Sequence, residues 1–348
     1  MLKLKKPRRL RPGSRVATVS PSWGGPGSVP SRYEMGVREL PERFGLTVVE
    51  MPHTRAPADY VWRHPEARAA DLHAAFADPT MDGVIATIGG DDSIRVLPYL
   101  DPAVFRDHPK VFMGFSDTTT LHLFALQAGL QTFYGPAVMA GIAENGGMLP
   151  YTEALFRRVL MSGEPIGPLA PAAEWTEEPV RWEDTARAGQ RRTMQPNPGW
   201  RWLGGRDRVA GPLAGGCIEV VDFLRGTPWW PGPAVWDGAV FFFETSEDVP
   251  PPAQVKYWLR VYGMLGIVER LAGILVGRPR GYTPEQHQEL EHALLQIVAD
   301  EFGRPDLPIV TGLDFGHTDP QMILPLGARV ELDPGAGTIV LPEAGTEV

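Results

Sequence analysis

The sequence contains one cysteine, Cys217, and no apolar run that approaches the roughly 18 residues expected of a membrane-spanning helix. A single cysteine excludes an internal disulfide bond and any Cys-x-x-Cys metal site. Basic residues are also few, since 33 Lys and Arg stand against 42 Asp and Glu, and the formal net charge is −9. This charge argues against binding to the phosphate backbone of nucleic acids, which requires a basic face.

The one dense basic stretch is KLKKPRRLRPGSR, residues 3–15. No apolar segment typical of a secretion signal follows it, so we interpret it as a solvent-exposed leader strand. A lipid-binding or nucleic-acid-binding patch is the less favoured alternative. Together with the lone cysteine, this pattern predicts a cytoplasmic protein that acts on neither membranes nor nucleic-acid polymers.

Strand-like and helix-like segments alternate in the first part of the sequence, and the length of 348 residues predicts two domains. Apolar runs predict strands within residues 15–23, 46–52, 81–90 and 110–116, and each is followed by a helix-like pattern. Such alternation is typical of a parallel sheet covered by helices on both faces. In these α/β sheets, functional residues lie in loops at the carboxyl ends of the strands.

The composition changes near residue 165. Residues 166–205 are rich in proline, tryptophan and charge and show no sustained periodicity, which predicts a long loop or linker. We therefore predict an N-terminal domain over residues 1–165 and a C-terminal domain over residues 206–348. The tryptophans of the loop either pack it onto its own domain or form an aromatic wall for a substrate, and both interpretations stay open. These tryptophans are Trp175, Trp182, Trp200 and Trp202.

Ser116 lies where the apolar run KVFMGF meets a helix-like segment, within Gly114-Phe115-Ser116-Asp117-Thr118. A serine at a sharp strand-to-helix turn has the geometry of a nucleophile elbow, in which the next backbone amide faces the same space. The second glycine of the G-x-S-x-G motif is missing. A serine before aspartate is also an ordinary helix N-cap. The motif alone leaves the nucleophile and the cap as alternatives.

A serine nucleophile needs a base and an acid that orients the base. Among eight histidines, His317 stands out because it follows an apolar strand in the tight loop GLDFGHTDP. His122 lies in the helix after Ser116, points away from the turn, and is expected to be a packing residue. Glu244 ends the buried run AVFFFE, where a carboxylate is costly without a partner such as an imidazole N–H. We predict that Ser116, His317 and Glu244 converge.

Five motifs, in order and spread over almost the whole chain, resemble the LD-carboxypeptidase family of serine peptidases: ATIGGDDS, MGFSDTTTLH, YGP, FFFETSED and GHTDPQMILPLG. The Trp-rich segment is similar to the microcin C immunity branch of that family more than to its murein tetrapeptide carboxypeptidases. The resemblance implies an α/β fold with a flavodoxin-like parallel-sheet N-terminal domain that carries Ser116. It also implies a smaller α/β C-terminal domain that carries Glu244 and His317, with the active site between the domains.

The resemblance further implies a Ser-His-Glu triad, an oxyanion hole formed by the backbone amides of Gly90 and Asp117, no metal or cofactor, and a homodimer. The expected activity is hydrolysis of an amide or acyl-phosphoramidate or sulfamate bond through an acyl-enzyme. Aminoacyl- or peptidyl-nucleotides are the favoured substrates, because a nucleobase stacks well on tryptophan. Trp182 is the predicted stacking residue, with Trp200 and Trp202 behind it.

Three alternatives stay open on the sequence. The first is a murein tetrapeptide LD-carboxypeptidase that releases D-alanine. The second is a non-catalytic two-domain protein that binds a small molecule, in which Ser116 is only a helix cap. The third is a class I glutamine amidotransferase, which is disfavoured because those enzymes place cysteine at the elbow and Cys217 lies far from it in the sequence.

Overall fold

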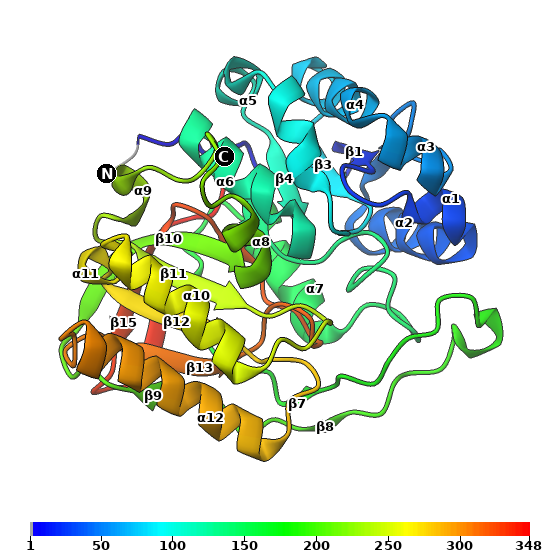
Figure 1. Cartoon of the computed structure of the whole chain (residues 1–348). Helices are drawn as coiled ribbons and strands as arrows, with labels where there is room; N and C mark the ends of the chain where they lie inside the picture. Colours follow the sequence, from blue (N-terminus) through cyan, green and yellow to red (C-terminus); the bar gives the residue numbers. More distant parts are fainter. Residues whose placement is uncertain (1–2) are drawn as a thin grey trace.

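The N-terminal part of the chain folds around a six-stranded sheet in which five strands run parallel (Figure 1). In the computed structural model, which describes residues 3–348, the strand order is β14-β5-β4-β3-β1-β2. The order β2-β1-β3-β4-β5 is that of flavodoxin-like folds, so the predicted fold class is confirmed. The strands are β1 (Arg15–Val19), β2 (Thr47–Glu50), β3 (Gly83–Ala86), β4 (Val111–Gly114), β5 (Phe133–Tyr134) and β14 (Leu324–Pro325).

Helices cover both faces of this sheet, because right-handed crossovers place α2 on one face and α4, α5 and α6 on the other. On its face, α2 packs against α7 through the stacked rings of Phe44 and Phe156, whose centroids are 4.0 Å apart. The α2 helix ends at Gly45, whose φ of 68° is favourable for glycine. The helices are α1 (Gly25–Ser28), α2 (Pro30–Phe44), α3 (Ala58–Arg63), α4 (Pro65–Ala77), η1 (Ser93–Tyr99), α5 (Pro102–Asp107), η2 (Ser116–Thr118), α6 (Thr119–Ala128), α7 (Pro150–Phe156) and η3 (Arg157–Met161).

The second sheet has eight strands in the order β6-β16-β15-β10-β11-β12-β13-β9. Its centre, from β10 to β13, is parallel, and antiparallel strands form both flanks. The three phenylalanines of β11 are buried, as their apolar run predicts. The strands are β6 (Gly167–Leu169), β9 (Arg201–Leu203), β10 (Val209–Cys217), β11 (Val240–Glu244), β12 (Gly273–Gly277), β13 (Ile309–Leu313), β15 (Arg329–Asp333) and β16 (Thr338–Leu341).

Two long helices, α10 and α12, lie side by side over this second sheet (Figure 1). The α12 helix begins with a capping box, in which Thr283 accepts from the amide of Gln286 and the Gln286 side chain accepts from the amide of Thr283. Within residues 3–348, none of the helices combines the length and the apolar character needed to cross a bilayer. The helices of this part are α8 (Ile218–Phe223), α9 (Pro233–Trp236), α10 (Pro252–Met264), α11 (Ile267–Arg270), α12 (Pro284–Leu295) and η5 (Gln296–Glu301).

The Trp-rich segment 166–205 is more ordered than its composition indicates. Its ends supply β6 and β9 to the second sheet, and β7 (Glu174–Trp175) pairs with β8 (Gln195–Pro196). The segment also holds the single turn η4 (Thr185–Arg187). The chain between β7 and β8 extends far from the second sheet, along the side of the first domain that carries α2 (Figure 1). We call residues 176–194 the extended loop. The domain boundaries at residues 165 and 205 stay a prediction.

Candidate active site

Ser116 occupies a sharp turn between β4 and α6. Its φ of 60° lies in the left-handed region, which only one other non-glycine residue, Val249, adopts within residues 3–348. Such a backbone is strained for a residue with a Cβ and is typical of functional turns. The Ser116 side chain does not cap the helix, because its hydroxyl faces His317, while Thr119 donates its own hydroxyl to the Ser116 carbonyl at 2.7 Å. The helix-cap alternative is therefore wrong.

The three side chains predicted to converge form one hydrogen-bonded chain. His317 Nε2 lies 3.1 Å from Ser116 Oγ, and His317 Nδ1 lies 2.7 Å from Glu244 Oε2. Ser116 comes from the end of β4 in the first sheet, whereas Glu244 ends β11 and His317 follows β13 in the second. The Glu244 carboxylate is fully buried, and the His317 side chain is only 7% exposed. The site thus lies where the carboxyl ends of two sheets meet.

Tyr134, at the end of β5, bridges the two ends of this chain. Its hydroxyl donates to Glu244 Oε1 at 2.6 Å and accepts from the backbone amide of Ser116 at 3.0 Å. Burial and the neighbouring Glu244 charge raise the pKa of Tyr134 well above its usual value, so the hydroxyl keeps its proton. Sequence reasoning recognised YGP only as a motif and missed this contact. Both carboxylate oxygens of Glu244 are therefore held in place.

The loop with Gly90 lies against the turn with Ser116, as the predicted oxyanion hole requires. A Cβ on Gly89 would lie 2.9 Å from Ser116 Cβ and 3.3 Å from the Asp117 amide nitrogen, so only glycine fits there. The Asp117 carboxylate anchors this loop, because its Oδ2 accepts from the amide of Ser93 at 2.8 Å. Gly90 itself has a φ of 155°, and a Cβ there would collide with the loop after β1.

A second carboxylate, which sequence reasoning missed, contacts the same imidazole nitrogen as Ser116. Glu247 Oε2 lies 2.9 Å from His317 Nε2. Burial lowers the pKa of His317, but the charges and hydrogen bonds of Glu244 and Glu247 outweigh burial and raise that pKa to about 10. The hydrogen bond to His317 in turn lowers the pKa of Glu247 to about 2. His317 therefore lies between two acids, and both favour the protonated form of its imidazole.

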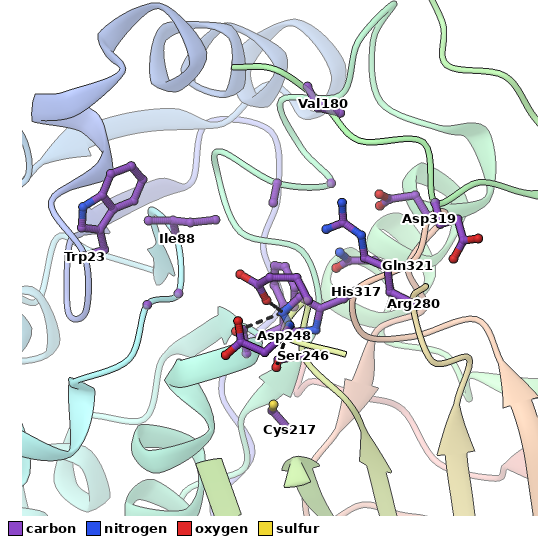
Figure 2. Close-up of a pocket in the computed structure, with 18 of the residues that line it drawn as sticks. Trp23, Ile88, Val180, Cys217, Ser246, Asp248, Arg280, His317, Asp319 and Gln321 are labelled. Carbon is purple, nitrogen blue, oxygen red and sulfur yellow. Dashed lines mark hydrogen bonds and ion pairs between the residues drawn. The ribbon is translucent and has the colours of Figure 1, made fainter. Parts of the chain in front are cut away.

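A cavity of about 620 Å³ opens beside Ser116 and His317 (Figure 2). Trp182, the predicted stacking residue, lines it, and so does Trp23, which follows β1. The two rings are stacked with centroids 6.1 Å apart. Trp23 was missed, although its loop follows a parallel strand and was therefore a candidate for function. Arg32 also lines the cavity, with its guanidinium 6.0 Å from the Trp182 ring.

Trp200 and Trp202 do not line this cavity. The Trp200 indole N–H donates to Asp314 Oδ2 at 3.0 Å, and Trp202 belongs to the edge strand β9, where it packs against the core. The sequence left open whether the tryptophans of residues 166–205 pack this segment onto its own domain or form a wall for a substrate. Trp200 and Trp202 pack the segment onto its domain. Among the tryptophans of the segment, only Trp182 lines the cavity.

Arg192 fastens the extended loop to both domains. Its guanidinium, of which only 8% is exposed, contacts Glu144 Oε2 at 2.6 Å and Asp319 Oδ2 at 2.5 Å. Glu144 follows β5 in the first domain, whereas Asp319 lies two residues after His317. The loop that carries Trp182 is thereby tied to the loop that carries the imidazole.

Two other residues, of types that often act as a base or a nucleophile, serve here as packing residues. His122 is buried between Thr132 Oγ1 and the carbonyl of Gly114, at 2.8 and 2.9 Å, and burial lowers its pKa to about 4. Cys217 is buried, its thiol donates to Glu219 Oε2 at 3.3 Å, and burial raises the pKa of that thiol well above its usual value. A thiol kept in its protonated form is a poor nucleophile, which argues against the amidotransferase alternative.

Two family models match this chain, the LD-carboxypeptidase N-terminal domain over residues 16–135 and the LD-carboxypeptidase C-terminal domain over residues 210–332. The chain belongs to the LD-carboxypeptidase family. It is therefore a carboxypeptidase-like hydrolase with the two-domain α/β fold of that family. The alternative of a non-catalytic binding protein does not hold.

Three relatives match this chain over nearly their whole length. A Streptomyces coelicolor protein named as a carboxypeptidase is 30% identical over 98% of this chain and 97% of its own. The microcin C7 self-immunity protein MccF of Escherichia coli is 26% identical over 93% and 92% of the two chains. A Bacillus subtilis protein named as a murein peptide carboxypeptidase is 27% identical over 98% and 95%.

Several solved structures that resemble this chain are MccF or MccF-like proteins. An MccF-like protein from Streptococcus pneumoniae, in complex with AMP, has a TM-score of 0.84 and 32% identity over 94% of this chain and 98% of its own. MccF in complex with aspartyl sulfamoyl adenosine has a TM-score of 0.83 at 23% identity, over 99% of this chain and all of its own, and shares the fold.

Proposed function

We propose that this member of the LD-carboxypeptidase family is a serine hydrolase that cleaves the bond between an aminoacyl or peptidyl group and a nucleotide. The bond is an amide, an acyl phosphoramidate or an acyl sulfamate. The proposal rests on one observation: Trp182 and Trp23 line the same cavity as the hydrogen-bonded chain of Ser116, His317 and Glu244. A cytoplasmic location and the absence of a nucleic-acid polymer as partner are part of the same proposal.

In the proposed first step, His317 takes the proton of Ser116 as Oγ attacks the carbonyl carbon of the scissile bond. A C–O bond forms, and the carbonyl oxygen gains a negative charge that the amides of Gly90 and Asp117 stabilise. Each such donor contributes roughly 3 to 4 kcal/mol in the best-studied case. Glu244 holds the imidazole in the tautomer with a proton on Nδ1 and stabilises the imidazolium.

In the second step, the C–N bond breaks and His317 returns the proton to the leaving nitrogen. Water then attacks the acyl-enzyme, again with His317 as the base, and releases the acid together with Ser116. The position of His317 Nε2, at 3.1 Å from Ser116 Oγ, suits both proton transfers.

The nucleotide part of the proposal rests on the aromatic walls. Base stacking on an aromatic side chain contributes about 1 to 3 kcal/mol and tolerates any base. The ring centroids of Trp23 and Trp182 are 6.1 Å apart, slightly less than the separation that a base stacked between two rings requires. We therefore expect a base to enter when the extended loop shifts by about 1 Å. MccF-like structures hold AMP and aminoacyl-sulfamoyl nucleosides, which supports the same class of ligand here.

A murein tetrapeptide LD-carboxypeptidase is the second candidate. It is favoured by the Bacillus subtilis relative named as a murein peptide carboxypeptidase. The Arg280 guanidinium in the cavity would suit the terminal carboxylate of D-alanine. The two paired tryptophans have no counterpart role in that reaction, and for this reason we place it second.

The test is to incubate the purified protein with alanyl-sulfamoyl adenosine and, separately, with a murein tetrapeptide, and to identify the products by mass spectrometry. We expect release of sulfamoyl adenosine, a loss of roughly 10⁴-fold or more in kcat for Ser116→Ala, and no loss for Ser28→Ala, an exposed serine of α1. Trp182→Ala should lower kcat/KM by about tenfold or more, whereas the exposed Trp62→Ala should not. Release of D-alanine alone would overturn the nucleotide assignment.

A further inference from the structure

Charge is distributed unevenly over the cavity of the active site. On the side of the extended loop, several acids have basic partners: Glu144 and Asp319 both contact Arg192, Glu178 lies 3.5 Å from Arg187, and the Arg32 guanidinium lies nearby. Glu177 of the same loop instead accepts from the backbone amide of Gly281 at 2.7 Å. A ligand on this side, where Trp23 and Trp182 lie, therefore meets a wall whose charges are in large part balanced.

The opposite side of the cavity is acidic. Glu219 from α8 and Glu247 and Asp248 from the loop after β11 line it, and we call these three residues the acidic wall. In Figure 2, Cys217, Ser246 and Asp248 lie on the side of His317 opposite Val180. Arg280 also lines the cavity and its charge acts on Glu247, so the three carboxylates are only partly balanced.

Hydrogen bonds make the acidic wall one unit. Glu219 Oε1 accepts from both the amide and the hydroxyl of Ser246, at 2.9 and 2.8 Å. Ser246 Oγ in turn accepts from the amide of Asp248 at 3.2 Å. Glu219 therefore fixes the loop on which Glu247 and Asp248 stand.

The contact of Glu247 with His317 gives the wall a role in the reaction. The proton of Ser116 must go to His317 Nε2, the same nitrogen that Glu247 contacts at 2.9 Å. A neutral imidazole with a free Nε2 lone pair is needed for this transfer. Glu247 must then leave the imidazole. Its side chain is 58% exposed without substrate, and where a bound substrate displaces the surrounding water, a cationic group of that substrate would stabilise the carboxylate.

An aminoacyl substrate can supply that partner. The α-ammonium of an unblocked aminoacyl group is attached to the carbon next to the scissile carbonyl, which Ser116 Oγ attacks. With the nucleoside between Trp23 and Trp182, the acyl group extends toward the other side of the cavity, where the acidic wall stands. A basic side chain on the same acyl group would reach deeper along that wall, toward Glu219.

We propose that the acidic wall binds a cationic group of the acyl part of the substrate and that Glu247 passes from His317 to this group when substrate binds. The inference rests on the proposed function and narrows it. The preferred substrates are nucleotide conjugates of unblocked amino acids with basic or neutral side chains. Acidic acyl groups are disfavoured, although MccF structures hold aspartyl and glutamyl sulfamoyl nucleosides.

The test compares four sulfamoyl adenosine conjugates, those of lysine, alanine, aspartate and N-acetylalanine, by kcat/KM. The ratio of lysine to alanine reports a basic side chain, and the ratio of alanine to N-acetylalanine reports the α-ammonium. We expect the lysine conjugate to be cleaved about tenfold or more faster than the aspartate conjugate, because like charges repel at close range. A preference in either of the first two ratios identifies which cation the wall binds.

Glu247→Gln should reduce the lysine-to-aspartate ratio to within about threefold of one, and Asp248→Asn should reduce it in part. Ratios cancel any change in the basicity of His317 that these variants cause. Glu174→Gln, an exposed acid that does not line the cavity, should keep the wild-type ratio.

Two different failures can be told apart. Equal cleavage of all four conjugates by the wild-type enzyme, or faster cleavage of the aspartate conjugate, overturns this inference and leaves the proposed function standing. Cleavage of none of them overturns the proposed function, and the inference falls with it.

Discussion

At the scale of single residues, the most informative contact joins His317 to two acids at once. Glu244 holds Nδ1, and Glu247 shares Nε2 with the hydroxyl of Ser116. The two carboxylates stabilise the protonated imidazole, whereas the proposed reaction begins with the neutral one. The contact with Glu247 therefore opposes the first proton transfer, and the strength of His317 as a base depends on the position of Glu247.

We predict that kcat/KM rises with pH as His317 loses its proton and that Glu247→Gln moves this rise to lower pH. The pKa of His317 is raised to about 10, and removing one of the two charges that raise it must lower it. The protonated imidazole of His317 also stabilises the folded state, and this stabilisation decreases as pH rises. It is complete below the unfolded value of roughly 6.5 and is lost as pH rises through about 10.

The measurement is a pH profile of kcat/KM with the alanine conjugate, for wild type and Glu247→Gln, with Glu174→Gln as the control. An unchanged profile in Glu247→Gln would contradict the contribution of Glu247 to the basicity of the imidazole.

The sequence predicted Ser116, Glu244 and His317 because each ends or follows an apolar strand, where parallel sheets place functional side chains. Tyr134 and Glu247 could not be found in the same way. Tyr134 acts through a hydroxyl on a buried ring, and its partner comes from a strand about 110 residues away. Glu247 belongs to an acidic loop whose pattern is typical of an ordinary exposed turn.

At the scale of elements, the extended loop is the part whose position depends most on a few contacts. Besides Arg192, it is held by the carbonyl of Arg187, which accepts from the Asn145 amide at 3.2 Å, and by the carbonyl of Ala188, which accepts from the Gly146 amide at 2.8 Å. Buried apolar side chains are few in residues 176–194. Polar contacts, those of Arg192 among them, therefore hold the loop that carries Trp182.

We predict that Arg192→Ala raises KM for the nucleotide conjugate by about tenfold or more, with a smaller change in kcat. Removing the guanidinium leaves the carboxylates of Glu144 and Asp319 without a partner, and breaking a buried ion pair is strongly destabilising, by about 3 to 5 kcal/mol. Limited proteolysis should cut the extended loop faster in this variant. Arg187→Ala, an exposed residue of the same loop, should behave like wild type, and equal proteolysis of both variants would contradict the prediction.

Most long elements follow from hydrophobic periodicity, whereas the short ones do not. The strands β1 to β4 lie within the predicted segments, a helix follows each of them as predicted, and β11 lies within the apolar run AVFFFE. The strands β6, β7, β8 and β9 are two or three residues long, too short for any alternation to be visible. These short strands form because they pair with segments that are distant in the sequence, and a single sequence does not reveal such pairing.

At the scale of the whole molecule, the two domains are joined directly beneath the site. The hydroxyl of Thr119, at the start of α6, accepts from the amide of Cys217 at 3.0 Å, and a Cβ on Gly216 would lie 2.4 Å from that hydroxyl. Gly216 also has a φ of 149°. The close approach of these backbones fixes the distance between the turn with Ser116 and the strand that ends in Glu244.

The homodimer stays a prediction, and we propose that α10 contributes to its interface. Tyr257, Met264 and Leu265, on and just after this helix, are exposed apolar side chains, at 56%, 77% and 50%. Light scattering should give about twice the 38.2 kDa of one chain. Met264→Asp should shift the mass toward the monomer, whereas Trp62→Asp on α3 should not. A monomeric wild-type protein would contradict the prediction.

The position of β14 has a consequence for biosynthesis. This strand, residues 324–325, closes the edge of a sheet whose other strands lie within the first 134 residues. A ribosome that has completed the first 134 residues has therefore delivered a sheet with one edge open, and the missing strand emerges only after the central strands of the second sheet, β10 to β13, have been synthesised. The nascent chain carries Ser116 201 residues before it carries His317, so the nucleophile is made long before its base.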